Sequence, residues 1–291
     1  MNPTSKEQQL RTYYQALLRA WGCQHWWPAR TRFEVIVGAY LTQNTAWTNV
    51  ERGLRRLRGA GLLTLDGIRR TPLTHLESLI RSTGYFRQKA QRLKAFVAFL
   101  DDRYEGSLNR MFSQSTEKLR SELLALNGVG PETADSILLY AGNHPVFVGD
   151  TYARRILGRH GIVPANTSYE EIRHLFERAL APLSHNSKGQ RVRDFVPHDF
   201  REHGFSRAAE RHLAKRASAP EDLIEAGNAN SQTAVMQTHA PSPISRAKRP
   251  GLVQIFNDMH GLMVAVGKHY CFKSQPRCDQ CPLQPFLPKA G

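Results

Sequence analysis

The chain has 291 residues and a net charge of +15 at pH 7. This excess of positive charge suits a polyanionic partner such as nucleic acid, although a basic protein that its charge merely keeps soluble has the same composition. No apolar run is long enough to cross a bilayer, and the first residues lack the apolar core and cleavage site of a signal peptide. We therefore expect no membrane span and a cytoplasmic location.

Apolar residues recur with a helical period in almost every patterned segment, and no convincing strand is present. The sequence therefore predicts an all-α fold. In chain order, the first expected helices are one that begins after a Ser5 cap, one over residues 33–41, one that begins at Asn44 or Thr45, and one that begins at a capping box of Thr74 and Glu77. Helices over residues 87–104 and 119–126 follow, and another begins at Pro131. The last two run from a capping box of Ser168 and Glu171 to about residue 180, and over residues 252–270.

The helical pattern stops at Ser184. Residues 184–250 are polar and rich in Ser, Ala, Asn, Pro and charged side chains. Such a composition buries too little apolar surface to fold alone, so we expect a low-complexity, disordered insertion between two helical segments.

A glycine turn joins two expected helices near the middle of the chain. Its sequence is Leu126-Asn127-Gly128-Val129-Gly130. The two glycines permit a positive φ and a close approach of the backbone to a phosphate, and the next helix adds its partial positive charge. Val129 is expected to turn inward and hold the two helices together. An ordinary helical connection has the same pattern, so the turn alone leaves both interpretations open.

Asp150 follows the second of these helices across the short loop NHPVFVG. One interpretation is an N-cap aspartate that begins the next helix. The other is catalytic, because a carboxylate beside a sugar that develops positive charge lowers the barrier to losing its base.

The hairpin, its apolar second arm and Asp150 together resemble the helix-hairpin-helix DNA glycosylase superfamily. The segments RFEVIVGAYLTQNTAWTNV, SLIRSTGYFRQKAQRLKAF and GKHYCFKSQPRCDQCPL are similar to successive segments of endonuclease III relatives. This resemblance covers most of the chain except 184–250. It implies a two-lobed fold, with a helical barrel lobe of residues 33–141 that includes the hairpin. The second helical lobe would combine residues 1–32, 142–183 and 251–291.

The resemblance also implies roles for individual residues. Asp150 would stabilise the cationic sugar or activate the attacking water, and Gln43 would fill the gap left by a flipped base. The partner would be double-stranded DNA with a damaged base, bound by a monomer. The residues expected to contact the DNA are Gln43, Asn127, Gly128, Val129, Gly130 and Thr133. Arg87 and Lys89 either hold phosphate or form a solvated basic face.

The reaction type depends on the residue two places after Gly130. Bifunctional members of the family carry a lysine there, whose amine attacks the sugar, whereas this chain has Glu132. A carboxylate cannot form an imine, so we expect a monofunctional glycosylase without lyase activity.

Three tryptophans suggest the substrate. Trp26, Trp27 and Trp47 flank the segment that carries Gln43, and indole faces bind a cationic ring by stacking and cation–π attraction. Together with Glu132 they resemble the base pocket of 3-methyladenine DNA glycosylases, which implies alkylated purines as substrates. The tryptophans also suit an ordinary core. The rival functions are an endonuclease III-type glycosylase and lyase on oxidised pyrimidines, and a non-catalytic DNA-binding module.

Three of the four cysteines lie in one C-terminal run. Cys271, Cys278 and Cys281 have the spacing of three ligands of the [4Fe–4S] loop in endonuclease III relatives, but Leu287 occupies the fourth position. Four thiolates normally hold such a cluster. Cys23 is distant in sequence, and no motif supports His269 as a substitute. The loop therefore either holds a cluster weakly or is a packed remnant.

Overall fold

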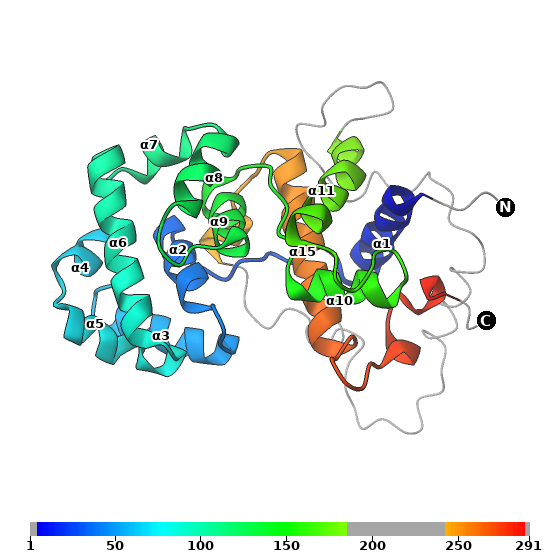
Figure 1. The fold of residues 1–291 in the computed structure, drawn as a ribbon, viewed down its shortest axis with the longest axis horizontal. Helices are drawn as coiled ribbons and strands as arrows, with labels where there is room; N and C mark the ends of the chain where they lie inside the picture. The colour runs from blue at the N-terminus through cyan, green and yellow to red at the C-terminus, as the bar shows by residue number, and fades with distance from the viewer. Residues whose placement is uncertain (1–4, 185–241, 289–291) are drawn as a thin grey trace.

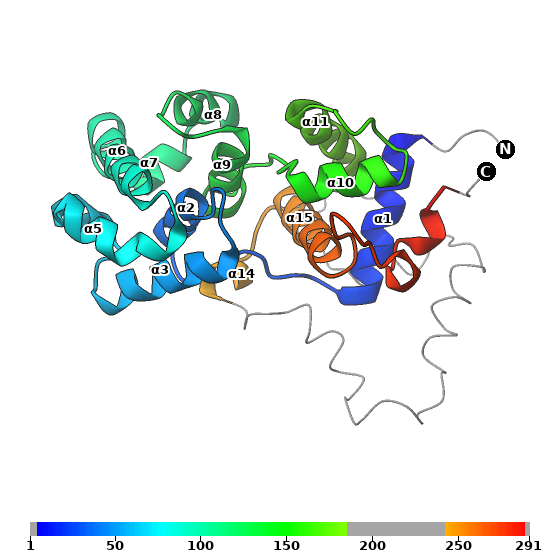
Figure 2. The same ribbon diagram turned by 60° about the horizontal axis from the view of Figure 1, so that its bottom comes forward.

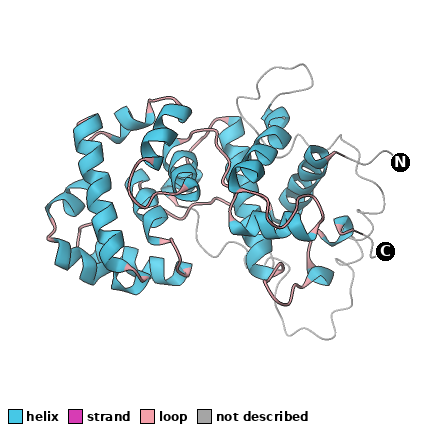
Figure 3. Ribbon diagram, viewed as in Figure 1, coloured by secondary structure: helices cyan, strands magenta, loops and turns pink. Residues whose placement is uncertain are grey.

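The computed structural model describes residues 5–184 and 242–288. All regular structure within these two ranges is helical, which confirms the predicted all-α class (Figure 3). None of the helices in these ranges is long and apolar enough to span a membrane.

The first lobe lies on the left in Figure 1 and is built around α2. This helix packs against α3, α6, α9 and η2, and all its residues from Phe33 to Leu41 are buried. The helices of the lobe are α2 (Arg32–Leu41), α3 (Trp47–Gly59), α4 (Leu65–Arg70), α5 (Leu73–Ile80), η1 (Arg81–Thr83), α6 (Phe86–Tyr104), α7 (Leu108–Phe112), α8 (Thr116–Leu124), α9 (Pro131–Ser136) and the π-helical η2 (Ile137–Gly142).

The second lobe combines segments from both ends of the chain, as the resemblance implies. The N-terminal helix α1 packs against α11 and α15, and the two views show α1 and α15 side by side (Figures 1 and 2). The lobe consists of α1 (Lys6–Trp21), α10 (Thr151–Arg159), α11 (Tyr169–Leu180), η3 (Ala181–Ser184), α15 (Gly251–His269), η5 (Cys278–Gln280) and η6 (Gln284–Phe286).

The two lobes meet at the end of the hairpin helix. The helix α9 continues into η2, and η2 contacts α15, the central helix of the second lobe. The chain then crosses to α10, whose N-cap is Asp150. This junction brings residues of both lobes to the start of α10.

Several predicted helix starts are confirmed. The Ser5 hydroxyl accepts a hydrogen bond from Gln8 N (3.2 Å), and Ser168 with Glu171 forms the predicted capping box. Pro131 stands in the first turn of α9, where its missing N–H removes no helical hydrogen bond.

Two predicted starts are wrong. Pro72 is the N-cap of α5, which places Thr74 inside the first turn rather than before it. The third helix begins at Trp47, beyond the predicted caps at Asn44 and Thr45. In both places a residue with extended backbone but no capping side chain precedes the helix, so side-chain capping gave no signal.

The predicted insertion of residues 184–250 lies outside the described residues except for Ser184 and 242–250. Ser242 caps the short helix α14 (Pro243–Arg246). Arg249 is 6% exposed and donates to Asn143 Oδ1 (3.2 Å) and Ile244 O (2.9 Å). Residues 242–250, which the prediction placed in the insertion, therefore include a short helix and a buried arginine.

Candidate functional site

The predicted glycine turn joins α8 to α9. Gly128 has a φ of +76°, whereas Gly130 has a φ of −91°, so only Gly128 needs the left-handed region. A Cβ at Gly128 would lie 1.9 Å from Nε of Arg92, so this glycine also leaves room for the guanidinium. Val129 is 6% exposed and donates its N–H to Leu126 O (3.1 Å), which agrees with the expected inward turn.

The side chain of Gln43 ties the end of α2 to the hairpin. Its Nε2 donates to Gly128 O (3.0 Å) and to Thr133 Oγ1 (2.9 Å). Its Oε1 accepts from Nη1 of Arg92 (2.9 Å). The turn after α2, the hairpin and α6 therefore form one hydrogen-bonded unit, with the positive charge of Arg92 beside the glycine. Asn127 is exposed at the tip of the turn.

Asp150 is both an N-cap and part of a buried polar chain. Its Oδ1 accepts from Ala153 N (2.8 Å), and the residue is 6% exposed. Its Oδ2 lies 3.4 Å from Nε2 of His260, and the other ring nitrogen of His260 is hydrogen bonded to the hydroxyl of Tyr140. His260 comes from α15 and Tyr140 from η2, so three elements converge on this carboxylate.

Glu132 stands in the first turn of α9, at the position where the resemblance places a lysine in bifunctional enzymes. Its side chain is exposed on one side. Even so, the surrounding protein raises its pKa, and the charge of Asp150 raises it further, while His260 and Arg154 act in the opposite direction. The two carboxylates are therefore close enough to influence each other.

The three tryptophans form one cluster. Their ring centroids are 5.9 Å apart for Trp26 and Trp27, 6.0 Å for Trp26 and Trp47, and 5.4 Å for Trp27 and Trp47. Trp27 is only 4% exposed and also packs on Tyr140 at 5.2 Å, so it lies in the core. Trp26 and Trp47 are partly exposed.

A lysine that the sequence did not single out lies beside this cluster. Nζ of Lys268, on α15, is 5.4 Å from the ring centroid of Trp26. Burial lowers the pKa of Lys268, while the charges of Glu51 and Asp150 raise it. Glu51 in turn accepts from Nε1 of Trp47 (2.9 Å). Lys268 therefore contacts the tryptophan cluster and lies close enough to Asp150 to interact with its charge.

The two basic residues expected on a phosphate-binding face have different surroundings. Arg87 is largely exposed, and its Nε lies 4.0 Å from Oε2 of Glu77. Lys89 is 1% exposed, and its Nζ donates to Leu41 O (2.9 Å) and Thr83 O (2.7 Å). Both predictions for Lys89, phosphate binding and a solvated basic face, are therefore wrong, because its buried ammonium links the end of α2 to η1 inside the lobe.

Tyr85 is the large hydrophobic side chain that the described residues leave exposed, at 68%. It lies in a turn with a φ of +46°, just before α6. Lys89 links this turn, through Thr83 O, to Leu41 at the end of α2, two residues before Gln43. Tyr85 and Gln43 therefore belong to neighbouring turns, and the sequence analysis missed Tyr85.

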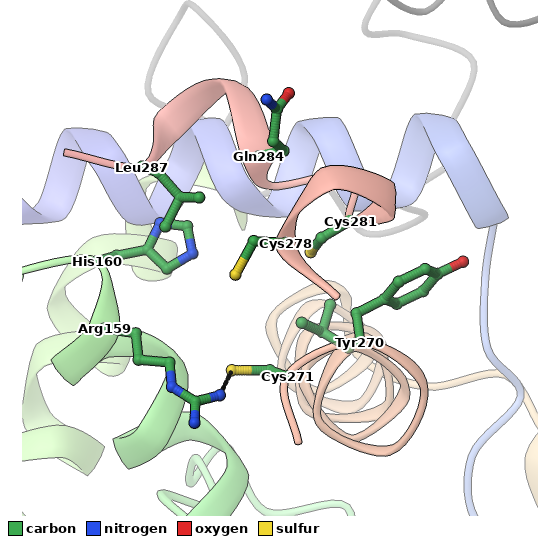
Figure 4. Close-up of a pocket in the computed structure, with 9 residues that line it drawn as sticks. Arg159, His160, Tyr270, Cys271, Cys278, Cys281, Gln284 and Leu287 are labelled. Carbon is green, nitrogen blue, oxygen red and sulfur yellow. Dashed lines mark hydrogen bonds between the residues drawn. The ribbon is translucent and has the colours of Figure 1, made fainter. Parts of the chain in front are cut away.

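The cysteine run surrounds a small cavity of about 20 Å³, which is room for roughly one water molecule. Cys271, Cys278 and Cys281 line it, and Leu287 lies at its edge where the family has its fourth cysteine (Figure 4). Nη1 of Arg159 donates to Sγ of Cys271 (3.1 Å). Within the described ranges, no three His, Cys, Asp or Glu side chains are placed to hold a metal ion.

This arrangement does not fit a four-thiolate iron–sulfur cluster. The donor set lacks its fourth sulfur, and the space between the three thiols is small. Neither Cys23 nor His269, the substitutes considered from the sequence, lines the cavity.

Comparison with known proteins places the whole arrangement in a family. Residues 37–182, about half of the chain, match the model of the HhH-GPD superfamily base excision DNA repair protein. A protein of Methanocaldococcus jannaschii whose name describes a DNA repair glycosylase is 44% identical over 178 residues, 60% of this chain and 80% of that protein. Endonuclease III-like protein 1 of Bos taurus is 32% identical over 155 residues. The chain covers about half of that bovine protein, 48%.

Solved structures show the same fold. One is H. pylori 3-methyladenine DNA glycosylase bound to 1,N6-ethenoadenine, with a TM-score of 0.58, 23% identity, and coverage of 91% of this chain and 98% of that chain. Another is endonuclease III in a trapped covalent intermediate with DNA, with a TM-score of 0.61, 21% identity, and coverage of 96% and 94%. Because the family model matches half of the chain and the relatives are similar in sequence, the chain belongs to the HhH-GPD superfamily of base excision DNA repair proteins and is a DNA glycosylase of that family.

Proposed function

We propose that this glycosylase is monofunctional and hydrolyses the N-glycosidic bond of alkylated purines, such as 3-methyladenine, in double-stranded DNA. The observation that carries the proposal is the pair of carboxylates at the lobe junction. Asp150 and Glu132 are close enough to shift the pKa of Glu132, and Glu132 replaces the lysine expected of a lyase. An acid pair without an amine at that position favours water as the nucleophile.

The chemistry needs few groups. The bond between C1′ of the sugar and the base nitrogen breaks, and its electron pair leaves with the base. A purine methylated at N3 or N7 is already cationic, so it departs neutral without a proton from the protein. The carboxylate of Asp150 stabilises the positive sugar. Water then adds its oxygen to C1′, and its proton passes to the carboxylate and on to solvent.

The tryptophan cluster supports binding of the base. Trp26 and Trp47 are partly exposed and can stack on a purine, whereas the buried Trp27 supports them from below. Lys268 already lies over one face of Trp26, and its charge repels a cationic base. We therefore expect the base to stack on Trp47, with the Glu132 carboxylate attracting its positive charge.

The hairpin, Arg92 and Tyr85 support binding of the strand. The N–H groups of Gly128 and Gly130 donate to no backbone carbonyl within the described residues, so they remain available to a phosphate. Arg92 adds a positive charge at the same place. Gln43 would have to leave its bonds to the hairpin to fill the gap of a flipped base, and the exposed ring of Tyr85 can stack on a neighbouring base.

Release of methylated purines from methylated duplex DNA tests the function directly. Asp150→Asn keeps the shape of the side chain but removes its charge, and we expect a loss of about 100- to 1,000-fold in single-turnover rate with duplex binding retained. Asp102→Asn is the matched control, because Asp102 is exposed at the far end of α6. Unchanged turnover in Asp150→Asn would show that this carboxylate is not the catalyst. A wild-type protein that binds the duplex but releases no methylated purine would favour a non-catalytic DNA-binding module.

One observation favours the rival lyase. Lys268 carries an amine near Asp150, and burial lowers its pKa, which is the property of a Schiff-base lysine. Borohydride reduction during turnover separates the two functions. A trapped protein–DNA adduct that disappears in Lys268→Met would establish lyase chemistry through this lysine. No adduct with wild-type protein that releases methylated purines would support the monofunctional glycosylase.

A further inference from the structure

Three buried polar side chains, those of Tyr140, His260 and Asp150, form a chain of contacts at the junction of the two lobes. Tyr140 is 1% exposed, His260 5% and Asp150 6%. The hydroxyl of Tyr140 is hydrogen bonded to Nδ1 of His260, and Nε2 of His260 lies 3.4 Å from Oδ2 of Asp150. That Nε2 forms no hydrogen bond within the described residues, so its approach to Oδ2 of Asp150 is a contact at 3.4 Å. The imidazole therefore lies between a phenol, to which it is hydrogen bonded, and the carboxylate beside it.

The chemistry of the two neighbours fixes the tautomer of the imidazole. An ionised carboxylate only accepts hydrogen bonds, so the nitrogen facing Asp150 must carry the proton. The other nitrogen then accepts, and the hydroxyl of Tyr140 donates to it. Burial, and then the charge of Asp150, raise the pKa of Tyr140 far above its usual range, so the phenol keeps the proton that it donates. The opposite tautomer would set a lone pair against the carboxylate.

The two oxygens of Asp150 have different neighbours. Oδ1 is held by the N–H of Ala153 at the start of α10, at 2.8 Å. Oδ2 lies 3.4 Å from Nε2 of His260. Without His260 the carboxylate keeps its hydrogen bond at Oδ1, and Oδ2 can swing about that fixed oxygen.

We infer that His260 and Tyr140 are positioning residues that hold the Oδ2 edge of Asp150 in place for the sugar cation. This inference rests on the proposed function of Asp150. An imidazole N–H that faces Oδ2 restrains the carboxylate, and the charge of that carboxylate stabilises the transition state. In the same way, an ordered hydrogen bond behind a catalytic group keeps it aligned in other enzymes.

Aromatic rings pack around the imidazole of His260. The ring of Phe147 meets His260 edge-on at 6.2 Å, and the ring of Tyr140 lies 5.7 Å away. The charged groups that act on this neighbourhood are Glu132 and Arg154 from the first turns of α9 and α10, with Arg249 and Asp258 beyond Tyr140. Lys268 of α15 is a further basic group that acts on Asp150.

Single-turnover kinetics with graded variants test the inference. His260→Leu removes both ring nitrogens, and we expect the rate of base release to fall roughly 10- to 100-fold, with the dissociation constant for duplex DNA changed less than about threefold. His260→Gln offers an amide N–H to Asp150 and should recover most of the loss. Tyr140→Phe should show a smaller loss. His174→Leu, an exposed histidine on α11, is the matched control.

Three results of these kinetics distinguish positioning from a merely structural role. In an Asp150→Asn background, His260→Leu should have no further effect on the residual rate, because residues that act as a unit are not additive. A structural role predicts that Gln fails to rescue, that DNA binding falls in parallel, and that the two losses multiply. Any of these three results overturns the inference.

A measurement without activity keeps the inference separate from the proposed function. Nitrogen NMR of histidine-labelled protein should show His260 as the neutral Nε2–H tautomer, assigned by its disappearance in His260→Gln. Tyr140→Phe should convert this signal into a mixture of tautomers. If the wild-type protein releases no alkylated purine, the proposed function fails while the NMR result still stands. A protonated imidazole or an Nδ1–H tautomer in the wild type overturns the inference itself.

Discussion

The hairpin region and the cysteine loop both carry a family motif, but the protein completes only the first. In the hairpin region the side chain of Gln43 has three hydrogen bonds, and both oxygens of Asp150 have a neighbour. In the cysteine loop three thiols line a small cavity that Leu287 closes with methyl groups. The contacts of the hairpin region are made by protein atoms alone. The cysteine loop, by contrast, lacks one of the thiol ligands that a cluster would need.

This difference shows what kind of motif can stand without a ligand. Contacts within the protein maintain the geometry of the hairpin, because the side-chain amide of Gln43 donates to the carbonyl of Gly128 and to the hydroxyl of Thr133. The cysteine loop instead depends on packing and on the bond from Arg159 to Cys271. Changes in the hairpin should therefore disturb DNA binding strongly, and changes in the loop should be tolerated.

The largest of these effects is expected at Gly128. An alanine there would have to adopt a φ near +76° and would displace the guanidinium of Arg92. The left-handed backbone costs an L-residue roughly 1–2 kcal/mol. Because Arg92 and Gln43 would shift together, we expect duplex DNA to bind Gly128→Ala about 10-fold more weakly, measured by fluorescence anisotropy.

Gly59→Ala is the matched control outside the hairpin. Gly59 is the last residue of α3, its φ is not positive, and a Cβ there meets open space. Its affinity should stay within about twofold of the wild type, since surface substitutions away from special backbone positions change little. Equal losses of DNA affinity in both variants would contradict the claim that the left-handed turn and Arg92 position the hairpin for DNA binding.

A second effect, on stability rather than on DNA binding, is expected at Lys89. Lys89→Met leaves the carbonyls of Leu41 and Thr83 without their donor, and the cost should be about 2 kcal/mol of unfolding free energy at pH 7. Urea unfolding measures it, and Lys118→Met on the exposed face of α8 should change stability by less than about 0.5 kcal/mol. A loss of unfolding free energy no greater than in the control would show that the hydrogen bonds of Lys89 are dispensable for stability.

The difference in stability between the wild type and Lys89→Met should also depend on pH. Burial, and then the charge of Arg92, lower the pKa of Lys89 from 10.5 to about 8. Between these two values the unfolded chain binds more protons than the folded one, so the contribution of Lys89 to stability rises with pH. The stability difference between wild type and Lys89→Met should therefore be constant below pH 8 and widen from pH 8 to 10.5. A difference that narrows over this window would contradict the assignment.

The sequence predicted the local parts of the site and missed those that depend on packing between distant segments. The left-handed Gly128 and the cap at Asp150 follow from residues within a few positions, so they could be predicted. The contact of Tyr140 with His260 joins residues 120 positions apart, and no local pattern announces it. Lys89 was misplaced because a helical period places the backbone but does not reveal two unpaired carbonyls from other segments.

The smallest effect on stability, and the clearest chemical change, is expected at Leu287. Leu287→Cys adds the missing thiol at the edge of the cavity that the other three cysteines line (Figure 4). After anaerobic reconstitution with iron and sulfide, this variant should bind about four irons per chain and show the visible absorption of a cluster, because four thiolates form the usual donor set. Reconstituted wild-type protein should hold less iron and lose it faster to a chelator.

Cys278→Ser separates ligation from packing in this experiment. Added to Leu287→Cys, it should abolish the gain in iron, whereas added to the wild type it should change the melting temperature little because Cys278 is partly exposed. If wild type and Leu287→Cys bind the same amount of iron equally tightly, three cysteines suffice, and the loop is as complete as the hairpin. In that case a fourth ligand must come from elsewhere, and the ring of His160, which lines the same cavity, is the group to replace next.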